Sequence, residues 1–430
     1  MNTHTPAVRL RRAERFQVEM RTLSLDQMLP PDHVARVVWE VVREVDVSPL
    51  LADIRSTEHH AGNPAIDPHV LIALWLLATI QGVGSAREIE RRCREHMAYR
   101  WLCGDEPVNY HTLSAFRTGQ VAFLDTLLTT SVAGLLHQEL IVLDRVAQDG
   151  MRVRASAGQA SFRRRTTLQQ CLVEAEAQVQ TLQAQAEADP SVGARRQQRL
   201  AEDRAARIAA ALAEARTLAQ RREEVEASKG VKAKEPRAST TDPEARVMKM
   251  PDGGYRPAYN VALATTTVGG IIVGADVTNQ GADSGQLAPM AEQLEARYGA
   301  KPQEVLADGG FATLDDIQTM HADHQVLVYA PVKDEAKKRQ AGVDPFAPRP
   351  HDPEGVAAWR QRMGTAAAQT IYRERAQTAE WANAGMRNRG LYQLRVRGLA
   401  KVKAVVLWYV LAHNLLQATL LRARAQAAGD

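Results

Sequence analysis

Short runs rich in β-branched residues alternate with segments of helical periodicity in the second half of the chain. The runs "YRPAYNVALATTT" and "GGIIVGADVTNQ" follow each other around a short turn, which predicts two neighbouring strands. Further on, "EVLADGG" and "HQVLVYAPV" are expected to be strands. The first of these strands follows the helical segment "DSGQLAPMAEQLEARYG", which is expected to be capped by Asp283. The second follows the helical segment "FATLDDIQTMHAD". This order predicts an α/β fold in which a mixed sheet carries helices on both faces.

Three other stretches complete this region. Residues 141–156, "IVLDRVAQDGMRVRAS", are broken by Asp149-Gly150, which predicts a strand, a tight turn and a second strand. Residues 337–365 are rich in proline and glycine and predict irregular structure. "TAAAQTIYRERAQTAEWANAGMR" and "GLAKVKAVVLWYVLAHNLLQATLL" predict two long helices, with His413-Asn414 on the second as a buried, hydrogen-bonded pair.

An apolar spacing of four and three residues interrupts the predicted sheet region between residues 166 and 228. It runs twice, on either side of "ADPSVG", through Leu168, Leu172, Ala175, Val179, Leu182 and Ala186, and then through Ala201, Ala205, Ile208, Leu212, Ala215 and Ala219. This pattern is typical of two antiparallel helices packed as a coiled coil. We therefore expect a helical hairpin inserted into the surrounding domain, followed by a basic linker at residues 229–240.

Residues 1–140 are predicted to form a separate helical region. Asp67 before Pro68 marks one helix start, and Ser85 with Glu88 three residues later is the capping-box pattern. These helices carry several arginines, namely Arg87, Arg91, Arg92, Arg94, Arg100 and Arg117. Two interpretations stay open, a DNA-binding module and an ordinary solvated charged face.

Bulk composition narrows the class of protein. A net charge of +4 is small for 430 residues, but six arginines and one acid lie between residues 145 and 170. Three cysteines without a C-x-x-C pair argue against a disulfide framework and a thiolate zinc site. The start of the chain has no apolar core typical of a secretory signal, and the longest apolar run, residues 404–412, is shorter than the roughly 20 residues that a bilayer requires. We expect a bacterial cytoplasmic protein without a membrane partner.

Two aspartates, Asp149 and Asp308, are expected at strand ends. In "VLADGG", Asp308 precedes two glycines, and an Asp-Gly pair is common in turns because glycine accepts a positive φ. Loops at the carboxyl ends of central strands also hold the ligands of open α/β sheets. Two carboxylates about 4 Å apart repel by about 4 kcal/mol at an effective dielectric of 20, and oxygen ligands favour hard ions such as Mg²⁺. Asp144 is an alternative to Asp149, whereas Asp276 is expected to face solvent.

A third carboxylate is available from "YRERAQTAEWANAGMR". Glu380 and Arg387 are seven residues apart, which is two helical turns, so they share one face. Residues 371–403 contain eight basic residues and two acids, an excess that suits contact with a phosphate backbone. A solvated surface helix with an acid and several bases is the alternative.

Together these motifs resemble the bacterial insertion-sequence transposases of the DDE class, whose catalytic domain has an RNase H-like fold. The resemblance covers nearly the whole chain and includes "AQDGMRVRASAGQASFRRR", "DVTNQGADSGQLAPM", "VLADGGFA" and a "Y-x-x-R…E…K/R" signature. It implies that Asp149, Asp308 and Glu380 are catalytic and hold two Mg²⁺ ions, for which Mn²⁺ substitutes. Tyr372, Arg375 and Arg387 match the flanking signature. Arg387 stands where lysine is common, and the gap between Arg375 and Glu380 is longer than in some relatives.

The resemblance also implies the reaction and the partners. Water would cut a phosphodiester at the transposon end, and the freed 3′-hydroxyl would attack target DNA. Transposon-end DNA, target DNA and a second copy of the chain are the expected partners. Two sets of residues are expected to contact DNA. The first consists of the signature residues Tyr372, Arg375 and Arg387, and the second is the arginine cluster Arg152, Arg154, Arg163, Arg164 and Arg165.

The predicted organisation is a DNA-binding region at residues 1–140, a catalytic domain at 141–400 with the hairpin inserted, and a C-terminal helix at 401–430. Two other functions fit the same residues. The chain could be a catalytically inactive DNA-binding regulator derived from a transposase, because the basic clusters work without metals. It could also be a scaffold built on the hairpin.

Overall fold

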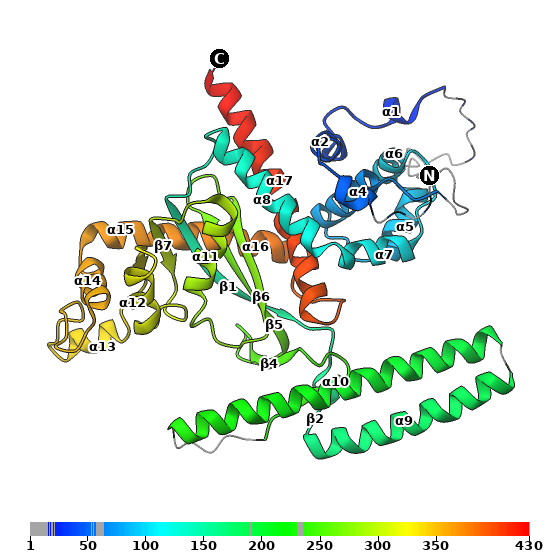
Figure 1. Cartoon of the computed structure of the whole chain (residues 1–430). Helices are drawn as coiled ribbons and strands as arrows, with labels where there is room; N and C mark the ends of the chain where they lie inside the picture. The colour runs from blue at the N-terminus through cyan, green and yellow to red at the C-terminus, as the bar shows by residue number, and fades with distance from the viewer. Residues whose placement is uncertain are drawn as a thin grey trace, which may run out of the picture.

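The computed structural model describes residues 22–52, 64–189, 191–229 and 235–429, together with the single positions 16, 18, 20, 54 and 56. The first fifteen residues, and residues 230–234 of the expected basic linker, lie outside the described part. A central sheet is flanked by helices, a group of N-terminal helices lies on one side of it, and a long helical hairpin lies along another (Figure 1).

The central sheet is mixed, as predicted. Its strands are β1 (Arg145–Arg154), β4 (Arg246–Lys249), β5 (Tyr255–Thr266), β6 (Ile272–Thr278), β7 (Glu304–Ala307) and β8 (Leu327–Tyr329). Strand β5 runs antiparallel to β1, β4 and β6, whereas β7 is parallel to β1 and β8 is parallel to β7. Strand β1 therefore lies at the centre, between an antiparallel and a parallel neighbour.

Strand β1 corrects one prediction. It is continuous over ten residues, and the turn expected at Asp149-Gly150 is wrong, because these residues pair with Leu263 and Ala262 of β5. Gly150 has another role here. A Cβ atom at this position would come within 2.8 Å of Oδ1 of Asp283, so only glycine allows that carboxylate to approach the strand.

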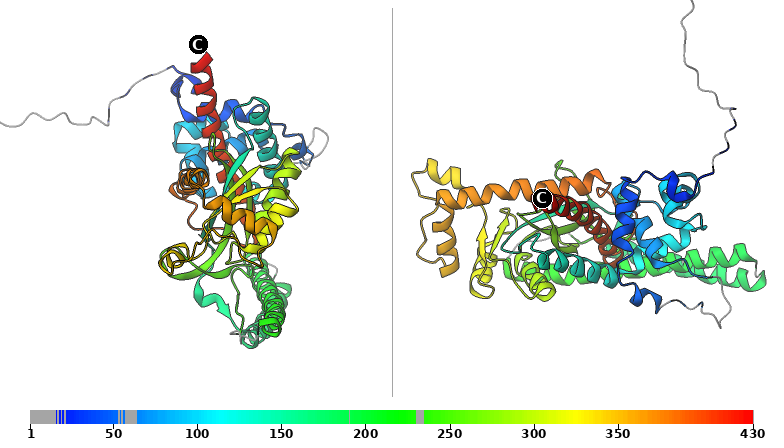
Figure 2. Two further views of the ribbon diagram at one scale, coloured as in Figure 1. Left: turned by 90° about the vertical axis from the view of Figure 1, so that its left-hand side faces the viewer. Right: turned by 90° about the horizontal axis from the view of Figure 1, so that it is seen from above.

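Helices cover both faces of the sheet, as expected. They are α11 (Leu287–Tyr298), α12 (Leu314–Ala322), α13 (Glu335–Gln340), α14 (Glu354–Met363), α15 (Ala366–Arg375), the π-helix η2 (Ala376–Glu380) and α16 (Trp381–Asn388). Seen from above, the continuous α15–η2–α16 segment lies along one side of the sheet, with α11 and α12 on the other (Figure 2). Two details of the prediction are wrong. Gln286, and not Asp283, precedes α11, and the proline-rich region expected to be irregular contains α13 and α14.

The N-terminal region is helical, as predicted. Its helices are α1 (Leu25–Met28), α2 (Val34–Val42), α3 (Ser48–Leu51), α4 (Pro68–Ile80), α5 (Ala86–Glu95), α6 (Met97–Cys103), α7 (Tyr110–Gly119) and α8 (Val121–His137). The side chains of Asp67 and Ser85 cap α4 and α5, as expected. The helical pattern of "SAREIERRCREHMAYRWLC" and that of "HTLSAFRTGQVAFLDTLLTTSVAGLL" each predict one helix, but the first is broken at His96, whose ring caps α6, and the second at Gln120.

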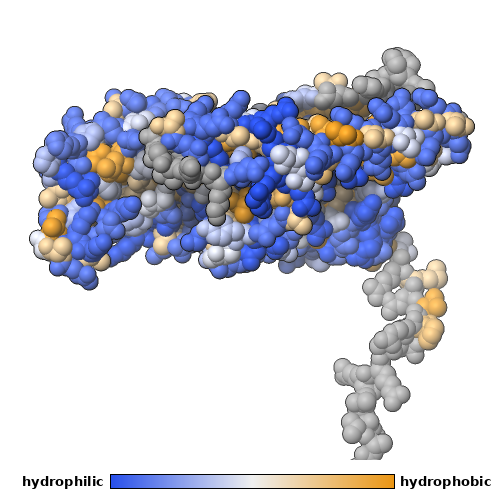
Figure 3. Space-filling model, turned by 90° about the horizontal axis from the view of Figure 1, so that it is seen from below, coloured by the Kyte–Doolittle hydropathy of each residue, from blue (hydrophilic) through white to orange (hydrophobic). Residues whose placement is uncertain are grey.

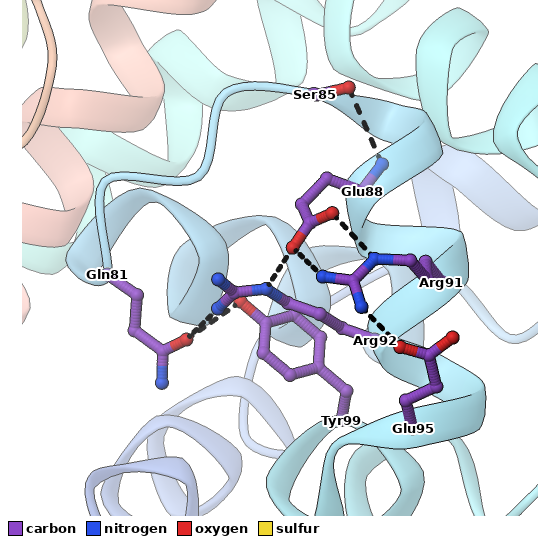
Figure 4. Close-up of polar contacts among 7 residues, drawn as sticks. All are labelled: Gln81, Ser85, Glu88, Arg91, Arg92, Glu95 and Tyr99. Carbon is purple, nitrogen blue, oxygen red and sulfur yellow. Dashed lines mark hydrogen bonds and ion pairs between the residues drawn. The ribbon is translucent and has the colours of Figure 1, made fainter.

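The arginines of this region are mostly engaged within the protein. Arg91 and Arg92 both donate to Glu88, and Arg92 also donates to Gln81 and packs over Tyr99 (Figure 4). Glu88 therefore completes only half of the expected capping box, because its carboxylate binds arginine and not the backbone of Ser85. Arg100 pairs with Asp105, and the half-buried Arg117 packs over Trp75. Of the six arginines, Arg87, Arg94 and Arg117 have no carboxylate partner in the described part of the chain.

Helix α17 (Leu399–Gly429) joins the N-terminal helices to the sheet. It packs against α4, α7, α8 and β6, and Trp408 lies 6.4 Å from Trp75 between ring centroids. His413 and Asn414 are buried and hydrogen-bonded to β6 and the turn before it, as predicted. By length and composition α17 could cross a membrane, but 72% of its most apolar window is buried inside the structure, as in the core helix of a soluble protein.

The helical hairpin is formed by α9 (Arg165–Ala188) and α10 (Val192–Lys229), which pack side by side. All twelve positions of the predicted apolar seam are buried or half-buried, whereas most positions between them are exposed. At the base of the hairpin, β2 (Phe162–Arg163) pairs with β3 (Ala238–Ser239). Residues 238 and 239 were expected to belong to a linker. They are buried against α10 instead, so that part of the linker prediction is wrong.

Candidate functional site

Asp149 and Asp308 lie beside each other on adjacent parallel strands. The last pair in the ladder between β1 and β7 is Gln148 with Ala307, and each aspartate is the next residue along the chain. Strand β7 ends there, whereas β1 continues along β5. The two carboxylates therefore meet at the carboxyl end of the parallel pair, although Asp149 is in the middle of its own strand and not at its end.

The carboxylate of Asp149 is held on both oxygens. Oδ1 accepts hydrogen bonds from Nη2 of Arg375 at 3.0 Å and from the backbone N–H of Gly150 at 2.9 Å, and Oδ2 accepts from Nδ2 of Asn383 at 2.9 Å. Burial raises the pKa of Asp149 above its ordinary value. Arg375 and Gly150 act in the opposite direction, and the nearby charge of Asp308 adds to the rise. Ionised Asp149 is thus costly without a cation beside it.

Asp308 is a turn residue and a site residue at once. Its Oδ1 accepts from the backbone N–H groups of Gly310 at 2.7 Å and Phe311 at 3.2 Å, which is the local bonding typical of aspartate in turns. Its Oδ2 lies 3.9 Å from Nη2 of Arg375, and its side chain is 41% exposed. Neither Gly309 nor Gly310 has the positive φ that the sequence predicted. A Cβ at Gly310 would instead come within 3.0 Å of the Asp308 carboxylate, so Gly310 is needed for close approach.

The α15–η2–α16 segment brings its side chains to this pair from one face. Arg375 ends α15 and reaches both aspartates, and Asn383 on α16 reaches Asp149. Burial raises the pKa of Tyr372, with Arg375 acting against this and the charges of Asp308 and Asp149 adding to it. Arg375 and the two aspartates are therefore in contact, and Tyr372 lies one turn before Arg375 on the same helix.

Glu380 is not in contact with the aspartates. It is exposed at the end of the π-helix η2 and makes no hydrogen bond or ion pair with the described residues. Correspondingly, the part of the chain that the structure describes holds no group of three or more acidic, histidine or cysteine side chains placed for a metal ion. A π-helix bonds residue i to residue i+5 and takes up one extra residue. Glu380 therefore stands one turn beyond Arg375, despite the long gap between them.

Two polar residues of the site were not predicted. Asn383 lies on a helix that the sequence singled out for its charges, and an amide gives no signal there. Asp283 was expected to cap a helix, but its side chain is buried and binds Asn260 and Arg152. Its oxygens would contact a Cβ at either Gly150 or Gly310, so the carboxylate lies close behind the two aspartates.

The arginines expected to contact DNA fall into two groups. Arg152 binds Asp283 and the carbonyl oxygen of Gly281, and Arg164 pairs with Glu235 at 3.4 Å. The others are exposed and, within the described residues, form no side-chain hydrogen bond or ion pair; they are Arg154, Arg163, Arg165 and Arg387.

The chemistry of the donors fits a divalent ion in part. Asp149 and Asp308 offer adjacent oxygen ligands, which suit Mg²⁺ or Mn²⁺, and the protein already places one cation, the guanidinium of Arg375, against both. The third expected ligand lies outside their reach in this conformation. The arrangement can therefore bind a cation between two carboxylates beside a helix that carries basic residues.

Comparison with known proteins identifies two matching families. The model described as Transposase domain (DUF772) matches residues 23–119, and the model described as Transposase DDE domain matches residues 227–415. The second range contains Asp308 and Glu380, whereas Asp149 lies between the two ranges. No curated protein and no solved structure matches the chain. With its helical N-terminal region, mixed sheet and paired aspartates, the chain belongs to the DDE transposases of insertion sequences.

Proposed function

We propose that this transposase binds the ends of its insertion sequence and cuts and joins DNA at the site around Asp149 and Asp308. The observation that carries the proposal is the register of β1 and β7, which sets these aspartates side by side with Arg375 against both. The strand order β6-β5-β1-β7-β8, in which β5 alone runs antiparallel to the other four strands, also supports an RNase H-like domain.

The proposed reaction has two phosphoryl transfers. In the first, a water oxygen bonds to phosphorus as the phosphorus–oxygen bond to the 3′-oxygen breaks, which leaves a 3′-hydroxyl and a 5′-phosphate. In the second, that 3′-hydroxyl attacks a phosphodiester of target DNA and releases another 3′-hydroxyl. Divalent ions held by Asp149, Asp308 and Glu380 would lower the pKa of the attacking group and stabilise the leaving oxygen.

The protein's own residues orient these groups. Asn383 and Gly150 fix the carboxylate of Asp149, and the turn at Asp308 holds the second carboxylate at the sheet edge. Arg375, released from the aspartates when they bind metal, and the exposed Arg387 would contact the phosphates of bound DNA. Because two ends must meet for joining, a homodimer is the proposed assembly.

Cleavage of a labelled duplex taken from the end of the insertion sequence, with Mg²⁺ or Mn²⁺, tests the proposal. We expect Asp308→Asn to abolish cleavage while DNA binding in EDTA persists. The matched control is Asp315→Asn, an exposed acid seven residues away without a side-chain partner in the described structure. If Asp308→Asn cleaves as well as the parent, the site assignment is wrong.

One observation favours a second candidate. Because Glu380 does not join the aspartates and Arg375 already offsets one of their two charges, the chain could be a DNA-binding regulator without catalysis. Binding of end DNA with no cleavage under any divalent metal, by the parent and Asp308→Asn alike, would support this second function.

A further inference from the structure

We propose that a basic pocket at the base of the helical hairpin binds a backbone phosphate of DNA, away from the candidate catalytic site. The pocket has a volume of about 360 Å³. Four arginines line it, and no carboxylate does; they are Arg163, Arg204, Arg207 and Arg397. This inference rests on the proposed function, because it takes the anion to be DNA.

The four arginines come from three different parts of the chain. Arg163 lies on β2, Arg204 and Arg207 lie on α10, and Arg397 lies in the loop before α17. Thr240 and Thr241, which follow β3, add hydroxyl groups to the wall. Folding thus gathers like charges that the sequence keeps apart, and such a concentration of guanidinium groups favours binding of an anion.

These arginines are available for a ligand. None of the four forms an ion pair within 4 Å in the described structure, in contrast to Arg164 and Arg246 nearby, which pair with Glu235 and Glu214. Arg204 donates one hydrogen bond, to Gln178, while the side chains of Arg207 and Arg397 make none. Substitution of the last two therefore removes positive charge without breaking a hydrogen bond or an ion pair of the described structure.

The position of the pocket suits a phosphate distant from the cut. Asp149 and Arg154 are five residues apart on β1, which is about 17 Å of strand, and the pocket lies beyond the Arg154 end, where the chain enters β2. That length corresponds to about five base pairs of duplex. The face of the molecule that carries the hairpin is dominated by hydrophilic side chains, with hydrophobic ones only in small separate patches (Figure 3). We therefore assign the pocket to the DNA flanking the catalytic site and not to a protein partner.

Cys171 provides a reporter inside the pocket. It lines the pocket and is half-buried, whereas the other two cysteines, Cys93 and Cys103, are buried in the N-terminal helices. Modification by the neutral reagent N-ethylmaleimide, followed by mass spectrometry, would therefore report on the pocket by itself. The experiment uses the full chain in EDTA, so that no cleavage interferes. Because backbone contacts do not depend on sequence, a duplex of about 30 base pairs with arbitrary sequence serves as the probe.

We expect bound duplex to slow the modification of Cys171 at least several-fold. The double variant Arg207→Gln/Arg397→Gln should bind the duplex on the order of 100-fold more weakly and lower the slope of log affinity against log salt by about one, because one phosphate contact is lost. The matched control is Arg216→Gln, on the same helix but nine residues, or two and a half turns, beyond Arg207 and thus on the opposite side. It should leave both readouts unchanged.

Three outcomes would overturn the inference. If the duplex binds but Cys171 reacts at its free rate and the double variant binds normally, the pocket is not a DNA site, while the proposed function stands. If inorganic phosphate at equal ionic strength protects Cys171 as well as DNA does, the pocket takes free phosphate and not the backbone. If no duplex binds at any salt concentration, the proposed function fails as well.

Discussion

Nη2 of Arg375 lies 3.0 Å from Oδ1 of Asp149, so a guanidinium stands where the proposed metal site needs a cation. The same nitrogen is 3.9 Å from Oδ2 of Asp308. Arg375 thus offsets one of the two negative charges without a metal, and its Nε atom is buried without a hydrogen-bond partner. Because an unpaired buried donor is costly, the ion pairs of Arg375 with the aspartates are suited to being exchanged for other contacts of its guanidinium.

Arg375→Gln is expected to tighten the binding of Mn²⁺ to the DNA-free protein by on the order of tenfold, because the metal no longer competes with a charge between the aspartates. Titration calorimetry or the electron paramagnetic resonance signal of free Mn²⁺ measures this directly. Arg373→Gln, which removes an exposed arginine two residues away, should leave the affinity unchanged. Weaker binding by Arg375→Gln would show that the guanidinium assists the metal.

Asn383→Ala is expected to lower the rate of DNA cleavage by roughly 10- to 100-fold, with little change in DNA binding, because Oδ2 of Asp149 loses the donor that orients it. Asn383→Asp should be worse, since it replaces a donor with a second negative charge against a buried carboxylate. Single-turnover rates and binding in EDTA separate the two effects. Equal rates for the parent and both variants would rule out a positioning role.

Deletion of Gln377 is expected to change the free energy of unfolding by no more than about 1 kcal/mol. Gln377 is an exposed residue of η2, and a π-helix that loses one residue can return to regular α-helical bonding while α15 and α16 keep their faces. Deletion of Ala384, also exposed but inside α16, must rotate everything after it and should cost several times more. Chemical denaturation measures both. Similar losses would mean that the π-helix does not absorb an extra residue.

Acid is expected to destabilise the protein through His413. Burial lowers the pKa of this histidine from 6.5 to about 4, and its Nε2 donates to the carbonyl oxygen of Gly270. Between about pH 4 and pH 6.5, His413 therefore binds a proton in the unfolded chain but stays neutral in the folded chain. The stabilising contribution is complete above about pH 6.5 and is lost as the pH falls toward 4, by about 3 kcal/mol in total.

His413→Gln should flatten this pH dependence, because a glutamine amide can donate to the same carbonyl but does not titrate. Denaturation at several pH values compares the variant with the parent. The exposed His137→Gln is the control and should keep the parental slope. An unchanged slope in His413→Gln would assign the acid sensitivity to other groups.

Local patterns in the sequence predicted the elements well, because helix caps and strand runs depend on neighbouring residues. Asp67 and Ser85 cap their helices as expected, and the hairpin seam follows the predicted spacing. The failure at Asp149-Gly150 has a different origin. The pair is a strong turn signal, yet the glycine is required because Asp283, more than a hundred residues later, packs against it. No local pattern contains that contact.

The residues of the candidate site were likewise predictable where local patterns define them, and not where tertiary contacts do. Asp149 and Asp308 come together because each follows the last pair of the parallel ladder between β1 and β7, and sequence patterns can anticipate such neighbouring strands although Asp149 lies within β1. Asn383 and Asp283 are defined by tertiary contacts alone. Glu380 ends a π-helix, which the residue spacing suggested only as an unusual gap, and no local pattern predicted that its side chain is exposed.

Helix α17, which packs against both the N-terminal helices and the sheet, sets the order in which the protein can fold. Trp75 of α4 packs on Trp408, and β6 is bonded to Asn414, so two parts of the molecule share a helix that follows both in the chain. Nascent chains leave the ribosome from the N-terminus, so the early helices emerge with their apolar surface uncovered. They must wait for nearly the whole chain to be translated, which makes the shared core a late and slow step of folding.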